Sequence, residues 1–356
     1  AIYGWRFADF RSFLNFERDW QGAKIVVLNE NYRSTPTILA AASSIIKNNV
    51  HQRRKDLWTK NSDHGPIKVI RAGDEDEEAA FIVETIKKFP ASDSRPQNAA
   101  ILYRTNAQSR AIEQALIQCD VPYRIYGGVK FYERKEIKDI VACLRFALNP
   151  KDELAAERIK KTFTKQKALK ILSDLPGFGK KGSTLEVINF FLSAGNYAAE
   201  LERGFRNAEE RMENIQELIV FASEFPTLES FVERVSLLQA TDLPANKILN
   251  SKSQIPNSVN LMTIHMAKGL EFNNVFVSGC AEGLLPHQMS YRLRDELEEE
   301  RRLMYVAMTR ARKNLTLSFA GLPSRFLYEI PAELTEFMNL GGDSKALPNE
   351  DAVYID

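Results

Sequence analysis

Short apolar runs of strand length alternate along the chain with segments in which apolar residues recur every three or four positions. The first such segment begins after Ser34 or Thr35, either of which can cap a helix with Pro36 in its first turn. Strands alternating with helices predict an α/β fold with a mostly parallel sheet flanked by helices. The runs that we interpret as strands are 24–28 (KIVVL), 67–71, 99–103 (AAILY), 123–126, 259–264 (VNLMTI), 273–279 (NNVFVSG) and a last one ending at 319.

The alternation stops at Asn149-Pro150, and residues 151–256 show helical spacing only. At the end of this stretch, 241–257 are rich in Pro and Asn, which is typical of a linker, and the strand pattern then resumes. We therefore predict an all-α subdomain, 151–256, inserted into one α/β domain. That domain would comprise 23–150 and 257–337, and residues 338–356 would form a flexible tail.

Composition adds little to this organisation but excludes several classes of protein. The chain has 356 residues, 44% of them hydrophobic and 27% charged, which is ordinary for a globular protein of two domains or of one domain with an insertion. It contains no apolar run of membrane-spanning length and no signal peptide. The three cysteines and four histidines are scattered, so we expect buried thiols in a reducing, cytoplasmic compartment and no metal site.

Charge gives only a local hint of a partner. The net charge is +1, so no global basic field indicates nucleic acid, but residues 151–181 hold nine Lys/Arg against four Asp/Glu. This surplus suits a nucleic-acid backbone, and a solvated helix face would have the same composition.

The residues with the clearest chemistry lie between 258 and 315. His265, Lys268, Gly269 and Glu271 follow the strand 259–264, at the carboxyl end where ligands bind in open α/β sheets. In the helix that follows, Arg310 and Arg312 fall in the last turn, where guanidinium groups suit a phosphate. The alternative is that these arginines complement the helix dipole and pair with the acidic run Glu298–Glu300.

Tyr32 and Arg33 occupy a second such position, between the predicted strand 24–28 and a helix N-terminus. A planar base could stack on the Tyr32 ring while the Arg33 guanidinium meets a phosphate. Alternatively, Tyr32 is an aromatic residue at the sheet edge and Arg33 a solvated charge.

The stretch from Gly177 to Gly182 (GFGKKG) matches the dinucleotide fingerprint G-x-G-x-x-G, but the preceding KALKILSDLP favours a helix over the strand that this motif requires. A nicotinamide enzyme is therefore disfavoured. We interpret the stretch as a hairpin whose backbone amides at Gly177 and Gly179, with Lys180 beside them, approach a DNA phosphate. An ordinary turn that uses glycines for positive φ remains open.

Eight motifs, taken together and in order, resemble the C-terminal portion of superfamily 1 DNA helicases of the UvrD/PcrA/Rep type. They cover nearly the whole chain outside 151–256. The motifs are IYGWRFADF (2–10), LNENYRS (28–34), ILYRTNAQSR (101–110), GGVKFYERKEIKD (127–139), MTIHMAKGLEF (262–272), LLPHQ (284–288), EEERRLMYVAMTRA (298–311) and PSRFL (323–327).

The resemblance implies a RecA-like fold and a role for each matched residue. Tyr32 would stack on the adenine of ATP, Arg33 and Arg310 would meet the γ-phosphate, and Gly269 and Glu271 would complete the ATP site, with Glu271 on the ribose side. Aromatic stacking and phosphate contacts would hold single-stranded DNA. The residues assigned to DNA are Tyr3, Trp5, Arg6, Arg104, Asn106, His265, Lys268, His287 and Phe326, to which we add Gly177, Gly179 and Lys180 of the hairpin.

The sequence also departs from the family pattern, because it contains neither G-x-x-x-x-G-K-[ST] nor an acidic DExx motif. In the family both belong to a first RecA-like domain, which would also supply the Mg²⁺ ligands. We therefore expect residues 1–22 to be the edge of that missing domain, and the chain alone to be inactive. The parent would be a 3′–5′ ATP-dependent helicase of DNA repair or replication, associated with the nucleoid.

The expected partners are single-stranded DNA, single-strand/double-strand junctions, the first motor domain and accessory repair or replication proteins, with no membrane. The alternative function, motivated by the absent phosphate-binding loop, is a non-catalytic DNA-binding or partner-docking module that keeps the RecA-like fold.

Overall fold

The computed structural model describes residues 2, 15–53, 55–89, 98–178, 182–241, 258–342, 344 and 346–348, without the side chains of 17, 240 and 241. The chain forms two compact units. The first consists of 1–104, 118–128 and 255–356, and the second of 105–117 and 129–254.

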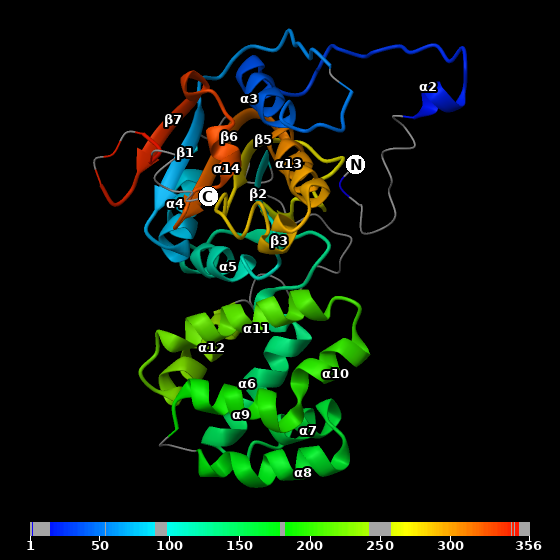
Figure 1. Ribbon diagram of the computed structural model, residues 1–356. Coiled ribbons are helices and arrows are strands. Elements are labelled where there is room, and N and C mark those ends of the chain that lie inside the picture. Colours follow the sequence, from blue (N-terminus) through cyan, green and yellow to red (C-terminus); the bar gives the residue numbers. More distant parts are fainter. Residues whose placement is uncertain are drawn as a thin grey trace. The chain divides into compact units, whose positions relative to one another are not determined.

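The first unit is built on a seven-stranded sheet in which every pairing between neighbouring strands is parallel (Figure 1). The order across the sheet is β3-β4-β2-β5-β6-β1-β7. A parallel order with crossovers confirms the predicted α/β, RecA-like architecture. The strands are β1 (Ile67–Ala72), β2 (Ala99–Tyr103), β3 (Tyr123–Ile125), β4 (Val259–Thr263), β5 (Phe272–Val277), β6 (Ala311–Ala320) and β7 (Thr335–Asn339).

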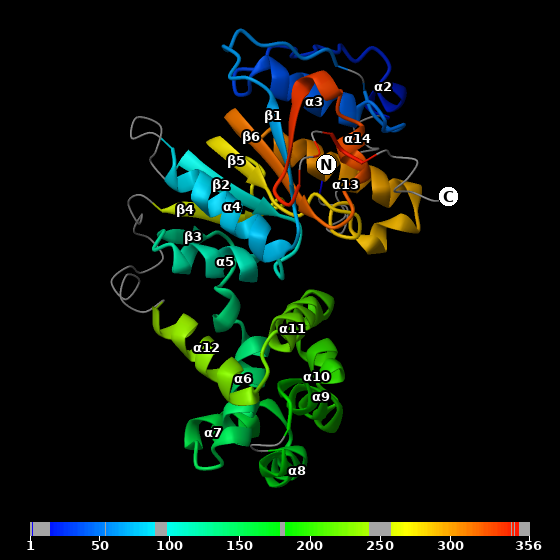
Figure 2. The ribbon, with the colours of Figure 1, turned by 90° about the vertical axis from the view of Figure 1, so that its left-hand side faces the viewer.

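Helices cover both faces of this sheet (Figures 1 and 2). On one face, α4 (Glu75–Lys87) buries Ala79, Ile82 and Val83, while α3 (Pro36–Ile46) and α13 (Arg294–Met308) share the core on the other. As predicted, α3 starts with Pro36 in its first turn, and the Thr35 side chain accepts from the Ile38 amide. The shorter helices are α2 (Phe16–Asp19), η6 (Gln288–Tyr291), α14 (Arg325–Tyr328) and η7 (Ala332–Leu334).

The second unit is helical and has a core of its own, which includes the fully buried rings of Phe191, Phe221 and Phe231. Among its described helices, α6 has the most buried residues, and it packs against α7, α9, α11 and α12. Its elements are α5 (Ser109–Gln118), η3 (Phe131–Glu133), α6 (Lys135–Leu148), α7 (Glu153–Thr162), α8 (Lys165–Asp174), η4 (Leu175–Gly177), α9 (Thr184–Gly195), α10 (Tyr197–Gly204), α11 (Ala208–Ser223) and α12 (Leu228–Thr241).

The helical unit begins earlier in the chain than residue 151. Pro150 does follow the end of α6, but the buried side of α6 packs against helices that come after it, so 129–150 belong with the helical unit. The segment before Gly177 is helical, as α8 and η4 show, which removes the strand that a dinucleotide fingerprint requires.

The predicted strand at 24–28 is wrong. These residues belong to no sheet, and Val26 and Leu28 are 71% and 79% exposed. Apolar β-branched composition satisfies the strand pattern, but a strand also needs a neighbour with which to pair. The tail was predicted from 338, yet β7 extends to Asn339 and pairs with β1.

Candidate functional site

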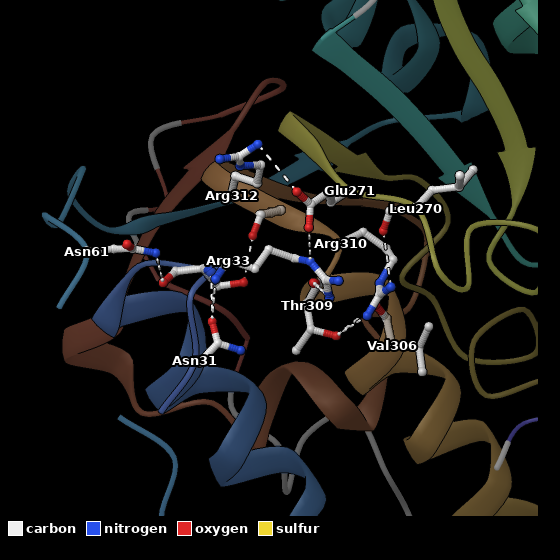
Figure 3. Close-up of polar contacts among 11 residues, drawn as sticks. Asn31, Arg33, Asn61, Leu270, Glu271, Val306, Thr309, Arg310 and Arg312 are labelled. Atoms are coloured by element: carbon white, nitrogen blue, oxygen red, sulfur yellow. Dashed lines mark hydrogen bonds and ion pairs between the residues drawn. The ribbon is translucent and has the colours of Figure 1, made fainter. Parts of the chain in front are cut away.

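Arg33 and Arg310 converge on one residue of the first unit, Thr309 (Figure 3). Arg33 Nη1 donates to the carbonyl oxygen of Thr309 at 3.3 Å, and Arg310 Nη2 donates to its hydroxyl at 3.2 Å. The Ser34 hydroxyl donates to the Ala311 carbonyl at 2.7 Å, which ties the segment before α3 to the start of β6. Two arginines distant in sequence are thereby brought to one place.

Glu271 lies against the same group of arginines. Arg33 Nε donates to its carboxylate at 2.6 Å, and Arg312 Nη1 lies 3.3 Å from the other oxygen (Figure 3). The hydrogen bond from Arg33 lowers the pKa of Glu271, and the positive charges of Arg312 and Arg310 lower it further. Three guanidinium groups beside one carboxylate leave an excess of positive charge, which suits a phosphate.

Arg310 is held more rigidly than Arg33. It is 8% exposed, and it donates to the carbonyls of Leu270 at 3.1 Å and Val306 at 2.9 Å. Burial and the neighbouring Arg33 lower its pKa to about 10, so it remains charged at neutral pH. Among the described residues, Arg310 donates to backbone carbonyls and to the Thr309 hydroxyl, and Arg312 pairs with Glu271. Neither arginine therefore pairs with the acidic run Glu298–Glu300, which was the alternative interpretation of these arginines.

This group lies at the amino ends of the strands, and the predicted carboxyl-end position is wrong for Gly269 and Glu271. The predicted place of Arg310 and Arg312 in the last turn of the helix is also wrong, because α13 ends at Met308 and β6 begins at Ala311. Glu271 and Arg310 immediately precede β5 and β6, and the Phe272 amide donates to the Arg310 carbonyl at 3.0 Å. The reason is that 264–271 returns from the end of β4 to the start of β5 by turns, without a helix. Gly269 adopts a φ of +93° within these turns.

Tyr32, which directly precedes Arg33 in the sequence, lies at the surface. Its side chain is 76% exposed, and its hydroxyl donates to Glu30 at 2.9 Å, so a ring face is accessible to a planar ligand. Asn31 was not predicted. Its side-chain oxygen accepts from the amides of Arg33 and Ser34, at 2.9 Å each, which fixes the turn that carries Arg33. An Asn just before a polar turn is the signal that could have indicated it.

A second group of predicted residues gathers around Glu300, near the carboxyl ends of β2 and β4. Arg104 follows β2 and donates from Nε and Nη2 to the Glu300 carboxylate at 2.8–3.1 Å, and the His287 amide donates to it at 3.0 Å. Burial, followed by the positive charge of Arg104, lowers the pKa of His265 to about 4. Lys268 is exposed in the turns that follow His265.

Of the other predicted DNA residues, Asn106 and Gly177 are described in the helical unit. Asn106 belongs to the helical unit, where its carbonyl accepts from Arg134 at 2.9 Å and its side chain lies 3.5 Å from Glu210. Gly177 is exposed at the end of η4. Tyr3, Trp5, Arg6, Gly179 and Lys180 lie outside the described residues.

The prediction that Phe326 lines a DNA track is wrong for this structure. Its ring is fully buried in the core of the first unit, and the Arg301 guanidinium carbon lies 5.3 Å from the ring centroid. A base cannot stack on a ring whose faces are already covered.

Within the described residues, no three or more acidic, histidine or cysteine side chains are grouped as a metal would require. No helix in this part of the chain has the length and apolar character to cross a membrane. Cys143 and Cys280 are buried thiols, as predicted, while Cys119 is only half-buried.

Comparison with known proteins points to one family. The family model of the UvrD-like helicase C-terminal domain matches residues 26–194 and 185–321. The ATP-dependent DNA helicase PcrA of Staphylococcus aureus Mu50 is 35% identical over 94% of this chain, and DNA helicase II of Haemophilus influenzae is 36% identical over 96%. These alignments cover 53% and 54% of the two relatives, so the chain spans about half the length of the curated relatives it matches.

Among solved structures, the C-terminal domain of a possible DNA helicase from Lactobacillus plantarum WCFS1 aligns with 86% of this chain and 98% of that one. The identity is 14% and the TM-score 0.39, a score too low to bear on function or fold.

Proposed function

The chain belongs to the family of UvrD-like helicase C-terminal domains, and from that premise we propose that it is the second motor domain of an ATP-dependent DNA helicase. In this proposal the sheet unit contributes part of an ATP site and part of a single-stranded DNA track. The helical unit is the insertion of that motor domain.

The convergence of Arg33 and Arg310 on Thr309 carries the nucleotide part of the proposal. Phosphoryl transfer spreads negative charge over the terminal phosphate oxygens, and fixed guanidinium groups stabilise that charge. Arg310 is pre-oriented by two backbone carbonyls, whereas Arg33 is held by Glu271 until an anion competes for it. Tyr32 then supplies a stacking surface for the base, and Glu271 a hydrogen-bond acceptor for the ribose.

The group around Glu300 carries the nucleic-acid part. Arg104, His265 and His287 place cationic and hydrogen-bonding groups near the carboxyl ends of β2 and β4, whereas Arg310 lies at the amino ends of the strands. Lys268 is exposed in the turns that follow His265 and adds a positive charge. Such groups bind the DNA backbone without regard to sequence, as a translocating motor requires. Residues 264–271 connect the carboxyl end of β4 to the amino end of β5 directly, so a change at one can reach the other.

The proposal assigns the phosphate-binding loop and Mg²⁺ ligation to a first motor domain. The described residues of this chain do not fit a metal site, so we derive no step through the metal. ATP binding would close the two motor domains and hydrolysis would reopen them, which moves the motor 3′ to 5′ along the strand. Accessory repair or replication proteins would act on the complete helicase.

Nucleotide binding is the first test. The 356-residue chain is titrated with a fluorescent ATP analogue and with inorganic pyrophosphate as competitor, and we expect weak binding that Arg310→Ala reduces by roughly tenfold or more. Arg18→Ala changes an exposed arginine and serves as the matched control. Equal binding by the wild type and the Arg310 variant would refute the arginine site.

Nucleic-acid binding and hydrolysis are the second test. We expect the chain to bind fluorescein-labelled oligodeoxythymidylate with an affinity that falls as salt rises. We also expect no DNA-stimulated ATP hydrolysis by this chain alone, since it lacks a phosphate-binding lysine. Hydrolysis that is lost in Arg310→Ala would show that the chain is a complete motor. Oligonucleotide binding without any nucleotide binding would favour the non-catalytic module.

A further inference from the structure

Glu300 is a buried carboxylate that no sequence motif assigned to a site. Its side chain is only 5% exposed, and both of its oxygens are used. Arg104 donates to both oxygens from Nε, at 3.1 and 3.0 Å, and to one from Nη2 at 2.8 Å. The backbone amide of His287 donates to the other at 3.0 Å. One carboxylate therefore holds a side chain at the end of β2 and the backbone of a loop that follows β5.

We propose that Glu300 is a positioning residue for single-stranded nucleic acid, which fixes the Arg104 guanidinium and the His287 loop for phosphate contact. This inference rests on the proposed function and deepens it. The Arg104 side chain is 21% exposed, so part of it remains accessible while Glu300 orients the buried part. A buried carboxylate is costly to desolvate, and here the guanidinium and the amide both offset that cost.

The position of Glu300 in α13 gives the inference a second consequence. Glu300 lies eight residues before Met308, where α13 ends, which corresponds to about 12 Å of helix rise, and Arg310 follows after the cap residue Thr309. Glu300 thus lies near the middle of α13 and Arg310 lies just beyond its C-terminal end, so one helix links the two groups of residues. A shift of α13 that accompanies anion binding at Arg310 would move the support of Arg104 as well.

Charge and positioning predict opposite effects of mutation, which makes the inference testable. Glu300→Gln removes a negative charge near the nucleic acid, so electrostatics alone would tighten binding. If Glu300 acts by orienting Arg104, Glu300→Gln weakens binding despite the gain in charge. Glu300→Asp keeps the charge but shortens the side chain, and it weakens binding too.

The experiment measures binding of fluorescein-labelled oligodeoxythymidylate to the 356-residue chain by anisotropy over a series of salt concentrations. We expect Arg104→Ala to weaken binding about tenfold and to reduce the salt slope by about 1, as loss of one phosphate contact does. We expect a similar loss in both Glu300 variants, and only a smaller further loss, through the His287 loop, when Glu300→Gln is added to Arg104→Ala. Glu296→Gln, at an exposed carboxylate of the same helix, is the control for charge.

Each result has a distinct meaning. Tighter or unchanged binding by Glu300→Gln, or a full loss on the Arg104→Ala background, overturns the positioning role. Absence of oligonucleotide binding by the wild type overturns the nucleic-acid part of the proposed function and the inference with it. Thermal unfolding of each variant is followed by circular dichroism, which ensures that binding is compared between folded proteins. If Glu300→Gln does not fold, Glu300→Asp provides the comparison.

Discussion

Arg33 and Arg310 donate to two different oxygens of the same residue, the carbonyl and the hydroxyl of Thr309. Because Thr309 follows α13 directly, the spacing of the two guanidinium groups is set by one helix end. The groups are therefore placed before an anion arrives, and little reorganisation remains to oppose binding.

We expect Arg33→Ala and Arg310→Ala each to weaken triphosphate binding by roughly tenfold or more, since a charge-assisted hydrogen bond contributes about 1.5–3 kcal/mol. Arg310→Ala should also lower the free energy of unfolding, because it leaves the Leu270 carbonyl without its donor. Titration with a fluorescent ATP analogue and urea unfolding measure the two effects. Arg33→Ala, at a more exposed side chain, should affect binding more than stability.

Tyr32 should matter through its ring and not through its hydroxyl. The ring is largely exposed, and the hydroxyl reaches only Glu30 among the described residues. We expect Tyr32→Phe to keep nucleotide affinity and Tyr32→Ala to reduce it, with a loss of about 1 kcal/mol that corresponds to exposed stacking. Pyrophosphate, which has no base, is the matched control ligand. An equal loss of pyrophosphate binding in Tyr32→Ala would assign the effect to the turn and not to stacking.

Most of the sheet was predictable, because short apolar runs between helical segments specify buried parallel strands. The six runs from 67–71 onward are strands in the structure, whereas 24–28 is not. Pairing depends on a partner strand, and local sequence does not contain that partner. The boundary of the helical unit was placed late for a similar reason, since the contacts of α6 with later helices leave no local signal.

The candidate site, too, was predictable only in part from the sequence. Arg33 and Arg310 could be chosen from motifs, but their convergence on Thr309 depends on how α3 and β6 meet. Glu300 stood in an acidic run whose members look alike in sequence, and only the fold shows which one faces Arg104. The prediction that Phe326 contacts DNA was wrong because the sequence does not distinguish an aromatic ring in the core from one that faces a ligand.

Gly269 should be required because of its positive φ and not because a side chain would lack room. Its φ is +93°, and a Cβ added there would meet nothing within 4 Å. We expect Gly269→Ala to destabilise the protein by about 1–2 kcal/mol, the cost of positive φ for a residue with a Cβ. Urea unfolding measures this value. Gly341→Ala, at a glycine without positive φ and equally open, should change stability little, and an equal loss there would contradict a backbone cause.

Phe326 should behave as a core residue. Truncation of its fully buried ring in Phe326→Ala should cost about 3–5 kcal/mol of unfolding free energy. Phe326→Leu, which keeps most of the volume, should cost far less and leave oligonucleotide affinity unchanged at a temperature where the protein is folded. Weaker DNA binding by a stably folded Phe326→Leu variant would restore the stacking role.

His265 should make the fold sensitive to acid. Burial and Arg104 hold its pKa near 4, although Glu300 acts in the opposite direction, and an unfolded histidine titrates near pH 6.5. Between these values the unfolded chain binds a proton that the folded chain does not, so stability is lost as the pH falls from about 6.5 to about 4. The loss from this group is as much as about 3 kcal/mol over that range. We expect His265→Gln to flatten the pH dependence of the unfolding free energy there, and the exposed His51→Gln to leave it unchanged. Urea unfolding at a series of pH values measures both, and parallel curves for His265→Gln and the wild type would show that acid acts through other groups.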